Sequence, residues 1–129
     1  MFDWIRFVVL GKILLDMKTE ESIRTAISRF YYGIFGVLRR YLINVKHKYV
    51  LMSRGGNVHE SVFRELSKSK DLTESEISSI FNKLRVMRNH ADYDAEFDYG
   101  YFMEFLVDYK KELKTIFDSM TYFIFDPNY

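Results

Sequence analysis

Residues 84–94, with the sequence LRVMRNHADYD, form the densest polar cluster of a chain that otherwise separates its charged residues. An α-helix turns by about 100° per residue, so Arg85, Arg88, Asn89 and Asp92 fall within an arc of roughly 100°. Paired guanidinium groups suit a phosphate, because each offers a planar fork of N–H donors to its oxygens. The spacing therefore predicts a phosphate-binding helix face.

His90 is the one histidine of this cluster. Its imidazole can transfer protons near neutral pH, and with an arginine to stabilise the phosphorane it could cleave RNA without a metal ion. On an ideal helix, however, His90 points about 140° away from Arg85. One site contains both only if the helix ends or bulges near Asn89, or if a second copy completes it. A solvated, charged helix face is the alternative interpretation.

A second polar strip is predicted on the helix that precedes this cluster. Arg29, Gly33, Gly36 and Arg40 share one face of a helix over residues 20–44. Two glycines between two arginines allow either another helix or a phosphate chain to come close. Helix packing is the favoured interpretation.

The remaining candidate residues are interpreted mainly as structural. Tyr31 and Tyr32 are expected to be core or interface rings, and His59 to start or pack a helix. His59-Glu60 lacks the second histidine of an H-E-x-x-H zinc site, and Gly55-Gly56 is not part of a phosphate-cradling loop. We therefore predict neither a metal nor a cofactor.

Apolar residues recur at helical spacing through most of the chain. In the first helix they include Trp4, Val9 and Ile13, and Thr19 and Ser22 offer caps for the second. A Thr73–Glu76 capping box is expected to start the fourth helix. The predicted helices cover residues 2–17, 20–44, 58–68, a segment from Thr73 through Ala91, and 97–120. Together they predict an all-α, single-domain, up-and-down helical bundle over residues 1–129.

The composition is that of a folded protein. Of 129 residues, 48% are hydrophobic and 29% charged, and the net charge of +1 excludes a protein that coats nucleic acid non-specifically. The aromatic content of 18% exceeds what a core of this size needs, which predicts an interface and a homodimer. No apolar run is long enough for a membrane span, so a soluble, cytoplasmic protein is expected.

Three segments in this order resemble one short branch of the HEPN superfamily. They are AISRFYYGIF at 26–35, a lone His59 before a helix, and LRVMRNHADYD at 84–94. The branch shows an A-x-S-R-x-YY-x-x-F element, a mid-chain histidine and an R-x-x-A-D-Y element. The resemblance implies a helical bundle that dimerises and is often encoded beside a minimal nucleotidyltransferase. It also implies that Ser28, Arg29 and Tyr32 lie near the cluster around Arg88.

The superfamily's motif is an arginine, four to six residues and a histidine, with a polar residue after the arginine. Two alignments compete here. Arg85 to His90 has the spacing, whereas Arg88-Asn89 has the polar neighbour but places Tyr93, not a histidine, five residues after Arg88. Arg88 is favoured as the aligned arginine, with His90 as a substitute base.

The sequence thus predicts a toxin or defence component, a metal-independent endoribonuclease that acts as a dimer. Arg85, Arg88 and His90 would be catalytic, and Asn89, Asp92, Tyr93, Arg29 and Tyr32 would bind RNA. The alternative is a non-catalytic partner that binds a minimal nucleotidyltransferase, the antitoxin, or a nucleotide. The resemblance raises Tyr93 as a site of adenylation by that enzyme. A structural helical adaptor is the third interpretation.

Overall fold

The computed structural model describes residues 2–52, 57–108 and 114, and these residues form helices without any strand. The elements are α1 (Ile5–Asp16), α2 (Glu20–Asn44), the 3₁₀ helix η1 (Tyr49–Met52), α3 (Val58–Ser67), α4 (Leu72–Tyr93) and α5 (Tyr99–Asp108). The predicted all-α helical bundle is confirmed for this part of the chain. None of the helices described is both long enough and apolar enough to cross a membrane.

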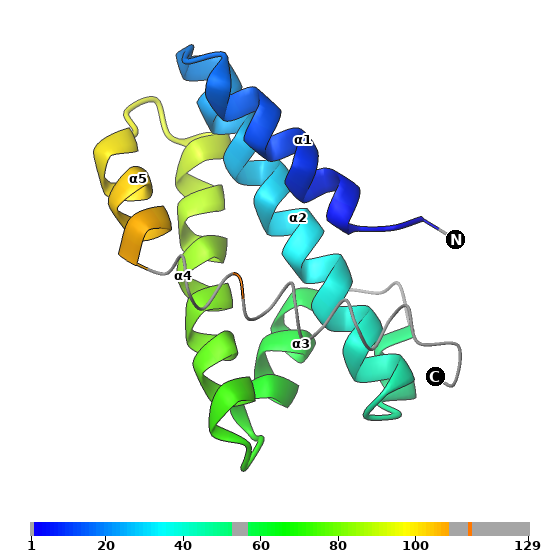
Figure 1. Cartoon of the computed structure of the whole chain (residues 1–129). Coiled ribbons are helices and arrows are strands. Elements are labelled where there is room, and N and C mark those ends of the chain that lie inside the picture. Colours follow the sequence, from blue (N-terminus) through cyan, green and yellow to red (C-terminus); the bar gives the residue numbers. More distant parts are fainter. Residues whose placement is uncertain (1, 53–56, 109–113, 115–129) are drawn as a thin grey trace.

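Helix α2 is the central element of the bundle. Figure 1 shows α1 lying along one side of α2, with α4 on the other side and α5 beyond α4. Helix α3 closes the bundle by packing against both α2 and α4. The core lies between these helices, and its largest fully buried side chains include Tyr31, Phe81 and Phe102.

The limits of α2 are those predicted from the sequence, residues 20–44. Its start is fixed by a reciprocal cap, in which the Thr19 hydroxyl accepts a hydrogen bond from the Ser22 backbone N–H at 3.2 Å. The Ser22 hydroxyl in turn accepts one from the Thr19 N–H at 3.1 Å. Two backbone donors that have no partner within the helix are satisfied in this way.

The start of α4 corrects one expectation. The helix begins at Leu72, so Thr73 occupies a helical position and not the cap position before the helix. Asp71 takes that place, because its Oδ1 accepts a hydrogen bond from the Glu74 N–H at 3.4 Å. Helix α5 was predicted over residues 97–120 and is described as Tyr99–Asp108; residues 109–113 and 115–120 lie outside the described residues.

The expected apolar stripe of α1 is only partly buried. Val8 is buried, but the side chains of Val9 and Ile13 are 50% and 57% exposed. Helix α1 packs chiefly on α2, which covers one side of it. Val9 and Ile13 belong to the predicted apolar pattern of this helix, but they lie outside the core.

The glycines of α2 are packing positions, as favoured from the sequence. A Cβ atom at Gly33 would lie 2.7 Å from Cγ2 of Val8, and one at Gly36 would lie 2.2 Å from the ring of Trp4. Both distances are far below a normal carbon–carbon contact. The absence of these two side chains lets α1 lie directly on α2.

We expect Gly36→Ala to displace Trp4 and lower the free energy of unfolding by about 1–3 kcal/mol, the usual cost of overpacking. Urea denaturation followed by circular dichroism measures this. Gly100→Ala is the matched control, because its Cβ would meet only Asp98 Oδ1 at 3.1 Å in an exposed turn of α5. Equal effects of the two substitutions would contradict the packing role of Gly36.

Candidate functional site

Tyr31 stands at the junction of α2, α3 and α4. Its side chain is fully buried, and its ring stacks on Phe81 of α4 with centroids 5.4 Å apart. Its hydroxyl forms a hydrogen bond with Nδ1 of His59 in α3 at 2.5 Å. The imidazole itself stacks on Phe35 with a centroid distance of 4.0 Å. His59 therefore packs, as expected, but it also bonds to a buried hydroxyl.

Two arginines of α4 converge on this Tyr31–His59 pair. The guanidinium carbon of Arg88 lies 4.9 Å from the centre of the Tyr31 ring and 5.6 Å from that of Tyr32. Arg88 also forms an ion pair with Asp92, with 3.7 Å between Nη1 and Oδ2. Arg85 donates a hydrogen bond to Glu60 of α3 at 3.0 Å. Two positive charges are thus held at the surface of the junction.

Arg29 of α2 extends this cluster past Tyr32. Its guanidinium carbon lies 5.7 Å from the centre of the Tyr32 ring and 4.8 Å from that of Phe7. The Nε atoms of Arg29 and Arg88 are buried, and neither has a hydrogen-bond partner in the part of the chain described. Buried donors without partners are unfavourable, so neither guanidinium group is fully satisfied by the described residues. As expected, Tyr32 lies against Arg88, and Arg29 contacts the same Tyr32 ring.

The environment keeps both groups of the central pair uncharged near neutral pH. Burial raises the pKa of Tyr31 to about 12, although Arg85 and Arg88 act in the opposite direction. Burial lowers the pKa of His59 from 6.5, and the positive charges of Arg85, Arg88 and Arg39 lower it further. His59 is therefore a neutral imidazole at pH 7, held beside guanidinium groups.

Helix α4, which carries the arginines, is held at both ends. At its start the buried Glu74 accepts a hydrogen bond from Tyr41 at 2.6 Å and pairs with Lys46 at 3.2 Å. Burial acts to raise the pKa of Glu74, but hydrogen bonds from Ser69, Tyr41 and Lys46 outweigh it and lower that pKa. The carboxylate thus stays ionised and ties α4 to α2.

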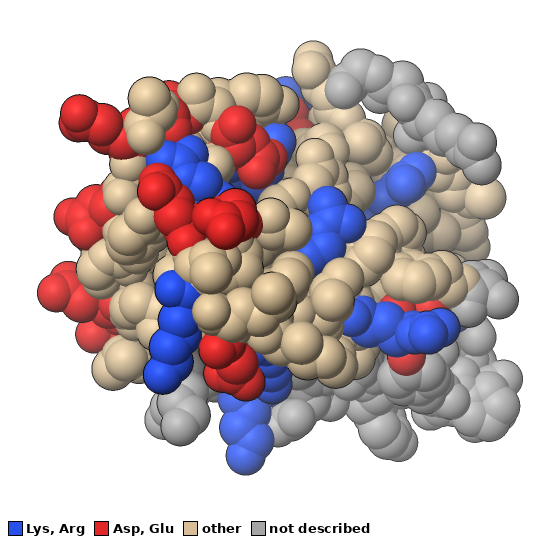
Figure 2. Space-filling view, turned by 90° about the horizontal axis from the view of Figure 1, so that it is seen from above, with Lys and Arg blue, Asp and Glu red and all other residues tan. Residues whose placement is uncertain are grey.

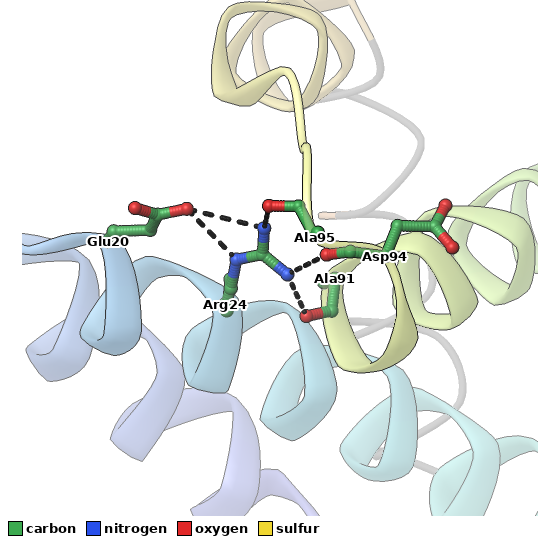
Figure 3. A network of polar contacts seen from close by, with 5 residues as sticks. All are labelled: Glu20, Arg24, Ala91, Asp94 and Ala95. Atoms are coloured by element: carbon green, nitrogen blue, oxygen red, sulfur yellow. Dashed lines mark hydrogen bonds and ion pairs between the residues drawn. The ribbon is translucent and has the colours of Figure 1, made fainter.

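At the other end of α4, Arg24 of α2 binds carbonyl oxygens that the helix leaves without partners (Figure 3). It donates to the carbonyls of Ala91 at 2.9 Å, Asp94 at 2.6 Å and Ala95 at 3.1 Å. Glu20 holds the guanidinium from the other side at 3.3 Å. Arg24 was not among the residues predicted to be functional, because a single basic residue in a helix does not indicate which distant carbonyl groups it will contact.

His90 does not share this site within one chain. Helix α4 continues without a break to Tyr93, so the helix neither ends nor bulges near Asn89. The His90 ring pairs with Asp94 and lines an open groove of about 480 Å³ with Phe97, Asp98 and six other residues. Of the two conditions set by the sequence for a joint Arg85–His90 site, only completion by a second copy remains.

His90 also lies at the acidic end of the bundle, formed by the α1–α2 turn and the α4–α5 connection. Figure 2 looks onto this end and shows carboxylates gathered over it. The exposed acidic residues at this end are Asp16, Glu20, Glu21, Asp94, Glu96 and Asp98. Their charge repels a phosphate chain, whereas the arginine cluster attracts one.

The other predicted binding residues line the end of α4. Asn89 is exposed, Asp92 reaches back to Arg88, and Tyr93 is 76% exposed. Tyr31 and His59, which were expected to be structural, form the central pair of this cluster. A signal for both was present in the resemblance, which contains the double tyrosine and the mid-chain histidine.

Comparisons of the chain with protein-family models, with curated proteins and with solved structures give no match. Its own geometry defines an all-helical protein with an arginine-rich site, in which a neutral histidine bonds to a buried tyrosine.

We expect Arg24→Lys to lower the free energy of unfolding by about 1–3 kcal/mol, because an ammonium group cannot reach three carbonyls in a planar fan. The same substitution should increase the rate of amide hydrogen exchange in residues 91–95. The matched control is Arg64→Lys, an exposed position of α3. Unchanged exchange in 91–95 would show that Arg24 does not hold this end of α4.

We expect Arg85→Met to raise the pKa of His59 towards 6.5, since it removes a positive charge but leaves the ring buried. Titration of the His59 ring protons by NMR measures the change. Arg64→Met should leave the His59 titration where it is in the parent protein. An unaltered His59 pKa in Arg85→Met would mean that Arg85 does not act on this ring.

Proposed function

We propose that this chain binds a phosphodiester of RNA at the Arg85–Arg88 cluster and cleaves it without a metal ion. It would act as a toxin or defence component, like the HEPN proteins that its sequence resembles. The observation that carries the proposal is the meeting of a neutral histidine, His59, with two guanidinium groups on one surface. This combination supplies a base and a phosphate clamp.

In the proposed reaction the ribose 2′-hydroxyl attacks the adjacent phosphorus. His59 takes the hydroxyl proton, a bond forms between the 2′-oxygen and phosphorus, and the bond to the 5′-oxygen breaks. Water or a protein acid returns a proton to that 5′-oxygen. Arg88 and Arg85 stabilise the charge that develops on the phosphorane oxygens. The products would be a 2′,3′-cyclic phosphate and a free 5′-hydroxyl.

This mechanism sets a condition on the tautomer of His59. The imidazole acts as a base at Nε2 only when its own proton sits on Nδ1 and is donated to the Tyr31 oxygen. The opposite arrangement, with the Tyr31 hydroxyl donating to Nδ1, leaves a proton on Nε2. ¹⁵N chemical shifts of His59 distinguish the two forms.

The second candidate function is nucleotide or RNA binding without cleavage, as part of a complex with a minimal nucleotidyltransferase. It is favoured by a hydrogen bond from Arg88 that helps to set the pKa of Tyr31. An oxygen that already accepts from Arg88 is suited to donate its own proton to His59. The imidazole would then present Nε2–H to a phosphate as a donor.

We expect Arg88→Met to slow RNA cleavage at least ~100-fold, equivalent to about 3 kcal/mol of lost stabilisation. His59→Gln should have a comparable effect, while Arg64→Met should retain the parent rate. EDTA should not change the rate. Gel analysis of end-labelled RNA, with a test for cyclic phosphate ends, measures each of these.

The remaining variants and conditions separate the alternatives. Because the pKa of His59 is lowered from 6.5, the rate should fall to half of its plateau only at a pH below 6.5. Loss of cleavage in His90→Gln with activity kept in His59→Gln would replace His59 by the composite Arg–His90 site of a dimer. A parent protein that binds RNA or a nucleotidyltransferase but cleaves no RNA would establish the second candidate function.

A further inference from the structure

The outer face of α1 carries several exposed apolar side chains, and none of the other described helices packs over them. Val9, Leu10, Ile13 and Met17 are 50%, 40%, 57% and 59% exposed, on a helix whose opposite side packs on α2. These positions lie on one side of the helix because they are spaced by one, three and four residues. Scattered exposed apolar residues are ordinary on a protein surface, but a continuous stripe along a helix marks a contact.

The stripe carries one charge at each end. Arg6, Val9, Ile13 and Asp16 follow one another at spacings of three, four and three residues, the alternation of a coiled-coil seam. Arg6 and Asp16 are exposed, and neither has an ion-pair partner among the described residues. The seam is thus positive at its start, apolar in the middle and negative at its end.

We propose that α1 pairs in antiparallel fashion with α1 of a second copy of this chain. A two-fold axis at the height of Gly11 places Val9 against the partner's Ile13 and Arg6 against the partner's Asp16. The symmetry repeats both contacts, so two ion pairs enclose a central apolar patch of four side chains. A two-fold contact requires a surface that is complementary to itself. The order positive, apolar, negative along α1 meets this requirement when the two helices are antiparallel.

The charges of Arg6 and Asp16 favour an antiparallel arrangement of the two helices and a second copy of this chain as the partner. A parallel pair in register would set Arg6 against the partner's Arg6 and Asp16 against the partner's Asp16, and like charges in contact are unfavourable. A single helix of 12 residues from each copy is smaller than a standard protein interface. The dimer is therefore reversible, and its association depends on concentration and on salt.

This dimer is independent of the proposed cleavage. Its contacts come from α1 alone, and none of its residues belongs to the Tyr31–His59–Arg85–Arg88 cluster. The residues with which α1 binds α2, Trp4, Val8 and Gly11, stay within each copy. Variants of the outer face can thus be tested without altering the candidate site.

Charge exchange is the decisive test. Sedimentation equilibrium of the full chain from about 10 µM to 1 mM should show a monomer–dimer equilibrium. Arg6→Asp should raise the dissociation constant at least ~tenfold, because it sets two negative side chains together, and so should Asp16→Arg. The double variant, Arg6→Asp with Asp16→Arg, should restore the parent value because each pair is re-formed with reversed sign.

Two further variants complete the experiment. Ile13→Asp should abolish the dimer, whereas Val107→Asp, on the exposed side of α5, should leave it intact. Circular dichroism of each variant checks that the bundle has formed. A parent protein that is monomeric at 1 mM, or a dimer that survives Ile13→Asp, overturns the proposal. Failure of the double variant to restore association overturns the antiparallel arrangement.

Discussion

The hydrogen bond between Tyr31 and His59 is the interaction on which the rest of the structure depends. It joins α2 to α3 inside the bundle, and the Tyr31 ring joins both to α4 by stacking on Phe81. Because the hydroxyl is fully buried, loss of its partner would leave an unsatisfied polar group in the core. The guanidinium group of Arg88 packs on the Tyr31 ring of the same pair. The contact that holds the helices together therefore also positions an arginine of the candidate site.

Burial and nearby charges set the protonation states of the two groups at this junction. Burial and the neighbouring guanidinium groups act together on His59 and keep it neutral, whereas on Tyr31 they oppose each other and burial prevails. Exposed carboxylates gather around the end of α4, and one carboxylate of this helix, Asp92, forms an ion pair with Arg88. A chain with a net charge of only +1 thus holds two arginines at one junction, each of them paired with a carboxylate of its own, Glu60 or Asp92.

The sequence by itself determined the helices. The limits of α2 follow from a strong apolar period and from the Thr19–Ser22 cap, both of which are local. It also favoured helix packing over a phosphate chain at Gly33 and Gly36, since their missing side chains make room for a neighbour. The start of α4 was missed because Asp71 and Thr73 are both good cap residues, and residue type alone does not choose between them.

Only the tertiary structure decided which histidine stands beside the arginines. His90 is close to Arg88 in sequence, but a continuous helix turns it to another face, and His59 arrives from α3 by a contact between distant segments. The tertiary structure also decided that Val9 and Ile13 remain exposed, because α2 covers only one side of α1. The spacing of apolar residues in a helix does not predict how many neighbouring helices will pack against it. The local sequence pattern determines which apolar side chains share one face of a helix. The packing of distant segments determines which of these side chains are buried.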